Sequence, residues 1–508
     1  MLAPDYLDHA PDRLILLWQQ AEDDILRDVA RRIGKMDTLT PTANWQLWRY
    51  QQTEAVRKDV VKLLARYTGK SEAEIRRLMK EAATAALEAE DEIYYHYGKE
   101  PTPFEESTPL QNLLNAGYRQ TAGSFSNLTA TTANTVSGAF EQALDRAWLQ
   151  VSSGAFDYKT AVKRAVDGLA DSMPYVTYPS GHRDTLEVAC RRAVLTGVNQ
   201  TGAKLQEARM DEMGASFVEV TAHGGARPSH AVWQGRRYHR GGAVDYLGQH
   251  YEDFESATGY GTGAGLCGWN CRHTFFVVFP ELGSPPAWTQ ESLEALNARD
   301  IEYDGRLYTR YEISQMQRAR ERAVRKWKRR YLAEDAAGAD TTASAMKLRQ
   351  ARQSLADFTR ATGGRVDSAR TSVHGFGRSA SSKASYAARK QERFNAANTE
   401  LQQMREAGTI KAKGRLIESP SAPNEINFAS DHVLQRWAER GMGPMDAERI
   451  IRSSKVAMSQ RNGTQTCYYS ELGFVAIGQD GNVSSIGPLD EGGKKLMEVV
   501  KKHGIPHS

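Results

Sequence analysis

The chain has 508 residues, of which 40% are hydrophobic and 25% are charged, a composition typical of globular proteins with about two to four domains. Its 66 basic and 62 acidic residues leave a net charge of +4, which excludes a protein that coats nucleic acid along its whole length. Four scattered cysteines exclude a disulfide framework, and no apolar run approaches the roughly 18 residues of a membrane span. The first residues lack a basic segment followed by an apolar core, so we expect synthesis in the cytoplasm and no membrane role.

Residues 1–110 are predicted to be a helical region. Apolar residues recur every three or four positions over 11–34, as in an amphipathic helix. A second helix is predicted to begin at Thr40-Pro41 and to end near Gly69. A capping box at Ser71-Glu72-Ala73-Glu74 then predicts a third helix that continues toward Tyr95.

Residues 111–290 are predicted to hold a helical part followed by a small α+β module. A connector at 99–109 precedes three predicted helices, at 130–151, 158–173 and 184–213. Strands are then expected at 216–221 and 274–279, and about fifty residues rich in Gly, His, Tyr and Trp lie between them. So long a loop segment in a compact domain is usually functional or held by specific contacts.

Residues 291–395 are predicted to be a basic helical and flexible linker. A helix is expected at 312–331, and it carries a run of eight basic residues, namely Arg318, Arg320, Arg322, Arg325, Lys326, Lys328, Arg329 and Arg330. Residues 366–388 offer little apolar surface to bury, so we expect a flexible or weakly ordered segment there.

Residues 396–508 are predicted to form a separate small α+β domain. Helices are expected at 430–440 and 445–453, and strands at 465–469, 473–478 and 483–486. The predicted fold class of the whole chain is therefore α+β and mainly helical, with a helical N-terminal framework, a Gly/Trp/His/Cys-rich module, a basic linker and this last domain.

The most distinctive residues occur in two segments of the module, at 223–235 and 267–273, and we expect the two segments to meet in one rigid site. Cys267, Cys271 and His273 are spaced so that they can supply three zinc ligands, with His230 or His223 as the fourth, although the spacing matches no standard zinc finger. The alternative is a site without cofactor, in which packing and hydrogen bonds lock the loops. The residues assigned to that structural or binding role are His223, Arg227, His230, Trp233, Trp269, Asn270 and Arg272.

Residues 1–377 resemble the phage minor capsid protein 2 family, which is related to the head-morphogenesis proteins typified by the F protein of phage Mu. Three segments carry the resemblance: YPSGHRDTLEVACRRAVLTGVNQT, HGGARPSHAVWQG and TGYGTGAGLCGWNCRH. The resemblance implies a virion component, made in the host cytoplasm, that acts in head assembly near the portal or in the capsid interior. Its implied partners are the portal and other head proteins, and it implies no catalytic residue.

Given this resemblance, the basic helix at 312–331 has two interpretations. Its cations either form a solvated basic face or contact packaged DNA or an acidic portal surface. Contact with phosphates would depend strongly on salt.

The last domain resembles small metal-independent ribonucleases of the barnase, EndoU, colicin and RelE type over about residues 427–503. A spacing of four places His432, Arg436 and Arg440 on one helical face, as an acid or base with two phosphate clamps, and Arg461, Tyr468 and Ser485 complete the predicted set. The resemblance implies an alternative function, a toxin-like effector that acts on RNA and is delivered with the virion. The structural alternative is a solvated arginine face with a capping histidine.

Overall fold

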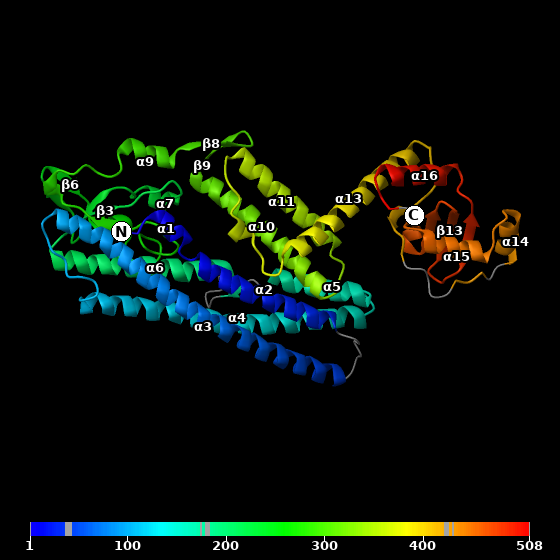
Figure 1. Cartoon of the computed structure of the whole chain (residues 1–508), viewed down its shortest axis with the longest axis horizontal. Helices are drawn as coiled ribbons and strands as arrows, with labels where there is room; N and C mark the ends of the chain where they lie inside the picture. Colours follow the sequence, from blue (N-terminus) through cyan, green and yellow to red (C-terminus); the bar gives the residue numbers. More distant parts are fainter. Residues whose placement is uncertain are drawn as a thin grey trace. The chain divides into compact units, whose positions relative to one another are not determined.

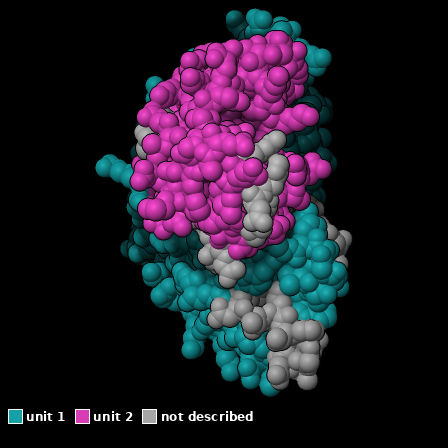
Figure 2. All heavy atoms as spheres, turned by 90° about the vertical axis from the view of Figure 1, so that its right-hand side faces the viewer, with its two compact units in different colours: residues 1–381 teal, residues 382–508 magenta. Residues whose placement is uncertain are grey.

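The computed structural model describes residues 2–35, 43–172, 175–177, 183–420, 426–428 and 431–506. Within these ranges, the side chains at 43–46, 129–130, 175–177, 431–433 and 436 are not described. The chain divides into two compact units, unit 1 (1–381) and unit 2 (382–508), which are coloured separately in Figure 2. Each unit is described below by itself.

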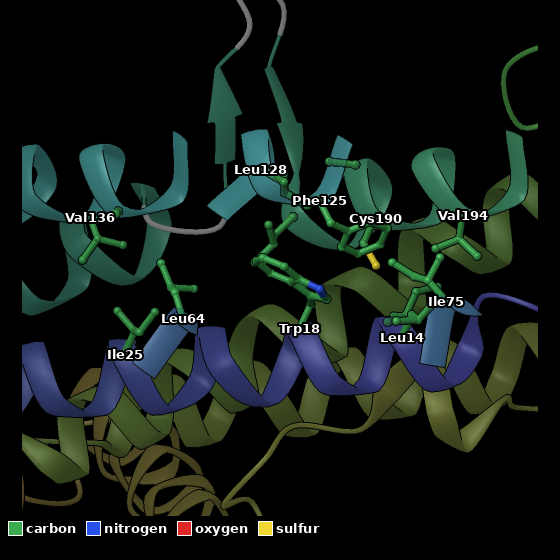
Figure 3. Packing of buried hydrophobic residues seen from close by; sticks show 14 of the residues in the cluster. Leu14, Trp18, Ile25, Leu64, Ile75, Phe125, Leu128, Val136, Cys190 and Val194 are labelled. Carbon is green, nitrogen blue, oxygen red and sulfur yellow. The ribbon is translucent and has the colours of Figure 1, made fainter. Parts of the chain in front are cut away.

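Long helices form the framework of unit 1, and several of them lie side by side (Figure 1). They are α1 (Pro4–His9), α2 (Asp12–Gly34), α3 (Ala43–His96), α4 (Thr108–Ser152), α5 (Tyr158–Ser172) and α6 (Leu186–Met213), with a hairpin of β1 (Tyr175–Thr177) and β2 (Arg183–Thr185) before α6. Trp18 of α2 is fully buried, and its ring lies 5.7 Å from that of Phe125 on α4. Figure 3 shows Trp18 directed toward Leu128 of α4 and Cys190 of α6, so the apolar stripe predicted at 11–34 faces the core.

The prediction of two separate helices on either side of Gly69 was wrong, because α3 runs unbroken through that glycine. The Ser71 hydroxyl donates to the Tyr67 carbonyl at 2.8 Å inside the helix, so Ser71 caps nothing. A glycine within a helix costs only about 1 kcal/mol relative to alanine. Burial of Leu64 and Ile75 on either side of it outweighs that cost (Figure 3). The start predicted at residue 130 was also too late, since α4 begins at Thr108.

The two strands predicted around the glycine-rich segment are neighbours in one small sheet, whose order is β4-β3-β7. Its antiparallel strands are β3 (Phe217–Val220), β4 (Arg237–His239) and β7 (Phe275–Val277). The segment between them also contains α7 (Pro228–Ala231), the hairpin of β5 (Val244–Tyr246) and β6 (Gln249–Tyr251), and α8 (Phe254–Thr258). The core of this module includes Tyr94 from α3 and Met210 from α6, so the module is built onto the ends of those two helices.

The remaining elements of unit 1 extend through the predicted linker. They are η1 (Pro280–Leu282), α9 (Gln290–Asn297), β8 (Arg299–Tyr303), β9 (Arg306–Thr309), α10 (Arg310–Ala336), α11 (Thr342–Ala361), α12 (Ser368–Thr371) and the start of α13 (Arg378–Glu406). The structure differs from the expectation of a flexible segment at 366–388. Thr371 and Val373 are buried, and the Phe376 ring contacts the ring of Tyr331 on α10 edge-on at 5.7 Å, so this segment packs against the rest of unit 1.

Unit 2 is an antiparallel sheet with helices on both faces. Its strands follow one another in chain order and are β10 (Arg415–Glu418), β11 (Val456–Gln460), β12 (Gln465–Ser470), β13 (Gly473–Gly478) and β14 (Val483–Gly487). Side chains of α13 and of α16 (Glu491–Lys502) cover one face, and those of α14 (Asp431–Glu439) and α15 (Pro444–Ser453) cover the other. The chain is thus mainly helical with small sheets, which confirms the predicted α+β fold class.

The basic helix α10 is not a solvated cationic face. Of the eight basic residues at 318–330, seven contact a partner within unit 1 and Arg322 is exposed, as is Arg310 at the start of the helix. The most buried pairs join Arg325 and Arg329 to Glu22 and Asp23 of α2, with N–O distances of 2.8 Å for Arg329–Glu22 and 3.2 Å for Arg329–Asp23. The sequence alone could not reveal this, because the acidic partners lie about 300 residues earlier in the chain.

We predict that Arg329→Ala lowers the free energy of unfolding of unit 1 by about 3–5 kcal/mol, because Asp23 then loses its paired cation and the buried Glu22 keeps only the more distant Arg325, at 3.8 Å. The matched control is Lys326→Ala on the same helix, whose side chain is 51% exposed beside Asp171. It should cost less than about 1 kcal/mol. Denaturant unfolding of the full chain, followed through the transition of unit 1, measures both effects, and equal effects would contradict the prediction.

Candidate functional site

The two distinctive segments of the module meet in space, as the sequence analysis expected. The Arg227 guanidinium donates to the Trp269 carbonyl at 2.7 Å, and His230 Nε2 lies 2.9 Å from the Ala264 carbonyl oxygen. The Arg272 guanidinium donates to the Gly225 carbonyl at 3.2 Å. Arg227 and Arg272 therefore each bind the backbone of the other segment, and these bonds satisfy loop carbonyls that no sheet pairs.

The turn at 259–268 is tight enough to require glycine. A Cβ added at Gly265 would lie 1.9 Å from the Gly259 carbonyl oxygen, and one added at Gly268 would lie 2.5 Å from the Gly263 carbonyl oxygen. Cys267 and Asn270 adopt left-handed backbone conformations, with φ of 57° and 54°. These glycines therefore permit a close approach of backbone segments.

A buried cluster of His230, Cys271 and His273 lies at the centre of the site. Cys271 Sγ is 3.7 Å from His230 Nδ1 and 3.6 Å from His273 Nδ1. The ligand atoms of the three residues all lie within 4.8 Å of one another. Cys267, which the sequence analysis placed in the metal set, is outside this group, and its thiol donates to the His273 carbonyl at 3.6 Å.

The histidines of the site are neutral near pH 7. Burial, followed by the Arg272 charge, lowers the pKa of His223 to about 3. Burial also lowers the pKa of His230 and holds that of His273 well below its usual value. Burial raises the pKa of the Cys271 thiol. His223 stacks on His273 with ring centroids 4.4 Å apart, and its Nδ1 accepts from the Gly225 amide at 3.2 Å.

The two tryptophans of the site have different positions. Trp233 is buried beside the His230 and His273 rings, at centroid distances of 4.5 and 4.9 Å. Trp269 is 59% exposed, although its ring lies so close to Gly263 that a Cβ there would be 2.6 Å from it. Asn270 is half-buried, and its side-chain oxygen accepts no hydrogen bond from the described residues.

Two amide side chains of α6 join the site to the helical framework. Asn199 Nδ2 donates to the Cys271 carbonyl at 3.0 Å and to the His273 carbonyl at 2.9 Å. Gln206 Nε2 donates to the Phe275 carbonyl at 2.8 Å and also contacts the Glu90 carboxyl group of α3. Asn199 and Gln206 are two helical turns apart and therefore lie on the same face of α6. The carbonyls of residues 271, 273 and 275 alternate along an extended segment and therefore point to the same side. The two periodicities therefore match at this contact.

Sequence reasoning missed Asn199, Gln206, Glu90 and Gln234. Gln234 accepts from His273 Nε2 at 2.9 Å and from the His223 amide at 3.1 Å. A usable signal existed in α6, because fully buried amide side chains seven residues apart on an otherwise apolar helical face need partners there. No such signal identified the partners, because the segment that Asn199 and Gln206 bind begins about 70 residues later.

The structure does not bring the described residues of the predicted ribonuclease set together. Tyr468 is 2% exposed in the core beneath α14 and α15, whereas Ser485 pairs with Ala476, whose side chain belongs to the core on the opposite face. Arg461 is exposed in the β11–β12 turn, by the end of the sheet where Gln465 pairs with Gly478.

Arg440 lies near the opposite end of that sheet, and its guanidinium donates to the Ile486 carbonyl at 2.7 Å. His432 and Arg436 belong to α14, but their side chains lie outside the described residues. The predicted ribonuclease site stays a prediction.

A loop module held rigidly by buried polar contacts on a long helical framework is typical of a structural protein. Comparison with protein families agrees, because residues 2–360 match the family model of phage minor capsid protein 2. The chain belongs to this family, and it is therefore a structural protein of the phage head, located in the virion. Comparisons with curated proteins and with solved structures gave no match. In the described part of the chain, no helix is long and apolar enough to cross a bilayer.

We predict that Asn199→Ala lowers the free energy of unfolding of unit 1 by about 2–4 kcal/mol, because it removes the amide donor of the buried Cys271 carbonyl and leaves the His273 carbonyl with only weak thiol donors. Lys204→Ala is the control, since Lys204 is exposed on the same helix. Denaturant unfolding measures both variants. A change in Asn199→Ala no larger than that of the control would show that the amide does not hold the module.

Glu90 gives the module a predicted pH dependence. Burial raises the pKa of Glu90 to about 7, and its Oε1 has no hydrogen-bond partner among the described residues. Because the folded-state pKa lies above the unfolded value of about 4.3, stability is highest below that value and falls as the pH rises through about 7.

Between the two pKa values of Glu90, we expect the free energy of unfolding to fall by up to about 1.4 kcal/mol per pH unit. Glu90→Gln should remove this pH dependence. Thermal unfolding of the variant and of the unchanged protein from pH 5 to about pH 8 tests this. Glu92→Gln, at an exposed position of α3, should keep the original slope. An unchanged slope in Glu90→Gln would refute the assignment.

Proposed function

We propose that this head protein acts in head assembly next to the portal, and that its glycine-rich module supplies the contact surface for another head protein. The family's relation to head-morphogenesis proteins supports a role in assembly. The single observation that carries the proposed contact is Trp269, a 59% exposed aromatic side chain on an otherwise rigid loop.

The loop holds Trp269 in a fixed and exposed position. Its ring lies against Gly263, and its carbonyl accepts from Arg227 of the neighbouring segment at 2.7 Å. Tryptophan and arginine are enriched among the residues that dominate binding energy in protein interfaces. A side chain that is already ordered loses little further entropy on binding, which favours affinity.

DNA and RNA contacts are not part of this proposal. Seven of the eight basic side chains at 318–330 contact groups of unit 1, and five of these are paired with carboxylates, which reduces the positive charge free for phosphates. The alternative of a virion-borne ribonuclease gains no support from the positions of Arg440, Arg461, Tyr468 and Ser485. Contact with packaged DNA and cleavage of RNA both stay predictions.

We predict that Trp269→Ala weakens binding to the partner by about 30-fold, the effect of losing roughly 2 kcal/mol at an interface hot spot, and depletes the protein from heads. Quantitative proteomics of purified virions, after complementation with each variant, measures the depletion. Leu307→Ala is the control, because Leu307 is a comparably exposed apolar residue of unit 1, 54% exposed, outside the module. Equal incorporation of the two variants would contradict the proposed contact surface.

Crosslinking mass spectrometry of the same virions tests the location. The proposal expects crosslinks from Lys204, on the helix beneath the module, to the portal protein. Crosslinks confined to the major shell protein would overturn the portal placement, but they would leave the membership of the head family intact.

A further inference from the structure

The cluster of His230, Cys271 and His273 joins the two segments of the module. His230 comes from α7, and the other two residues precede β7. All three are buried, with side chains directed at a common point, since their ligand atoms lie within 4.8 Å of one another. Neither the family assignment nor the proposed function gives this cluster a role.

Hydrogen bonds fix the orientation and the proton position of both imidazoles. His230 Nε2 lies 2.9 Å from the Ala264 carbonyl oxygen, and a carbonyl oxygen can only accept, so that nitrogen carries the proton. His273 Nε2 lies 2.9 Å from Gln234 Oε1, which also accepts from the His223 amide and is thereby identified as the amide oxygen. In each neutral ring, Nδ1 is therefore left with a lone pair.

Both lone pairs face the same sulfur. The Cys271 thiol has one proton and cannot donate to His230 Nδ1 and His273 Nδ1 at once. One buried acceptor is thus left unsatisfied in the metal-free protein, an arrangement that native structures generally avoid. Binding of a cation at this point would satisfy both nitrogens and the sulfur together.

The two sulfur–nitrogen distances fit a tetrahedral zinc ion. Bond lengths of about 2.0–2.1 Å to nitrogen and about 2.3 Å to sulfur place a nitrogen and a sulfur ligand about 3.6 Å apart. The sulfur is 3.7 Å from His230 Nδ1 and 3.6 Å from His273 Nδ1. The contacts at Nε2 also match the usual outer contacts of metal-bound histidine, which donates its other ring N–H to a carbonyl or carboxylate oxygen.

We propose that His230 Nδ1, Cys271 Sγ and His273 Nδ1 bind a zinc ion that joins the 223–235 segment to the 267–273 segment. Binding forms two Zn–N bonds and one Zn–S bond and displaces the thiol proton to solvent, and an exogenous ligand such as water completes the tetrahedron. Cys267 is not a ligand, since its thiol lies outside the group of three ligand atoms. This inference does not depend on the proposed function.

Metal analysis of the full-length protein, purified without chelators and then incubated with excess Zn²⁺ and desalted, tests the site. We expect about one zinc per chain in the unchanged protein and in Cys267→Ala, and loss of at least about tenfold in Cys271→Ala and His230→Ala, since removal of one of three ligands abolishes tight binding. The two cysteine variants are matched, because both remove a buried thiol of the same module. Absence of zinc from the unchanged protein, or its retention in Cys271→Ala, would overturn the proposal.

A second measurement covers the case in which the ligand variants fail to fold, as circular dichroism would reveal. Titration of the unchanged protein with Co²⁺ should give the near-ultraviolet absorption of a thiolate-to-cobalt bond and the intense visible bands of tetrahedral cobalt. Prior addition of Zn²⁺ should suppress both. A titration without these bands would refute the site, and so would their disappearance in Cys267→Ala.

Discussion

The hydrogen bonds from Asn199 and Gln206 to the carbonyls of residues 271, 273 and 275 are the contact on which the module depends. They match one face of a helix to one edge of an extended segment, so a shift of either element by a single residue would break them. Cys271 and His273 of the cluster and the exposed Trp269 belong to the segment that these amides hold or to the turn before it, and His230 reaches them from α7. The positions of these residues therefore depend on the position of α6.

The helices and strands with clear periodicity were predicted well, whereas the boundaries between elements and some further strands were not. The amphipathic stripe at 11–34 and the strands at 216–221 and 274–279 follow from local pattern. The break at Gly69 was wrong because burial on both sides of it outweighs the weak preference of one glycine. Strands β10 and β11 were not predicted, although β11 is buried between its neighbours.

The candidate site shows the same division. Spacing indicated Cys267, Cys271 and His273 as ligands, with His230 or His223 as the fourth, whereas the structure groups His230 with Cys271 and His273 and leaves Cys267 outside. That grouping depends on the left-handed conformation of Cys267 and on hydrogen bonds across the loops. In unit 2, the β-bulge before Ser485 decides which face that residue occupies, and no helical spacing could reveal it.

The unbroken α3 has a mechanical consequence. At about 1.5 Å per residue, its 54 residues extend roughly 80 Å. One part of it is paired to α2 through Asp59 and Arg32, and its last turns place Tyr94 in the core of the module. Because α3 has no break, a force that tilts the module would tilt the whole helix and would displace the far end of the bundle.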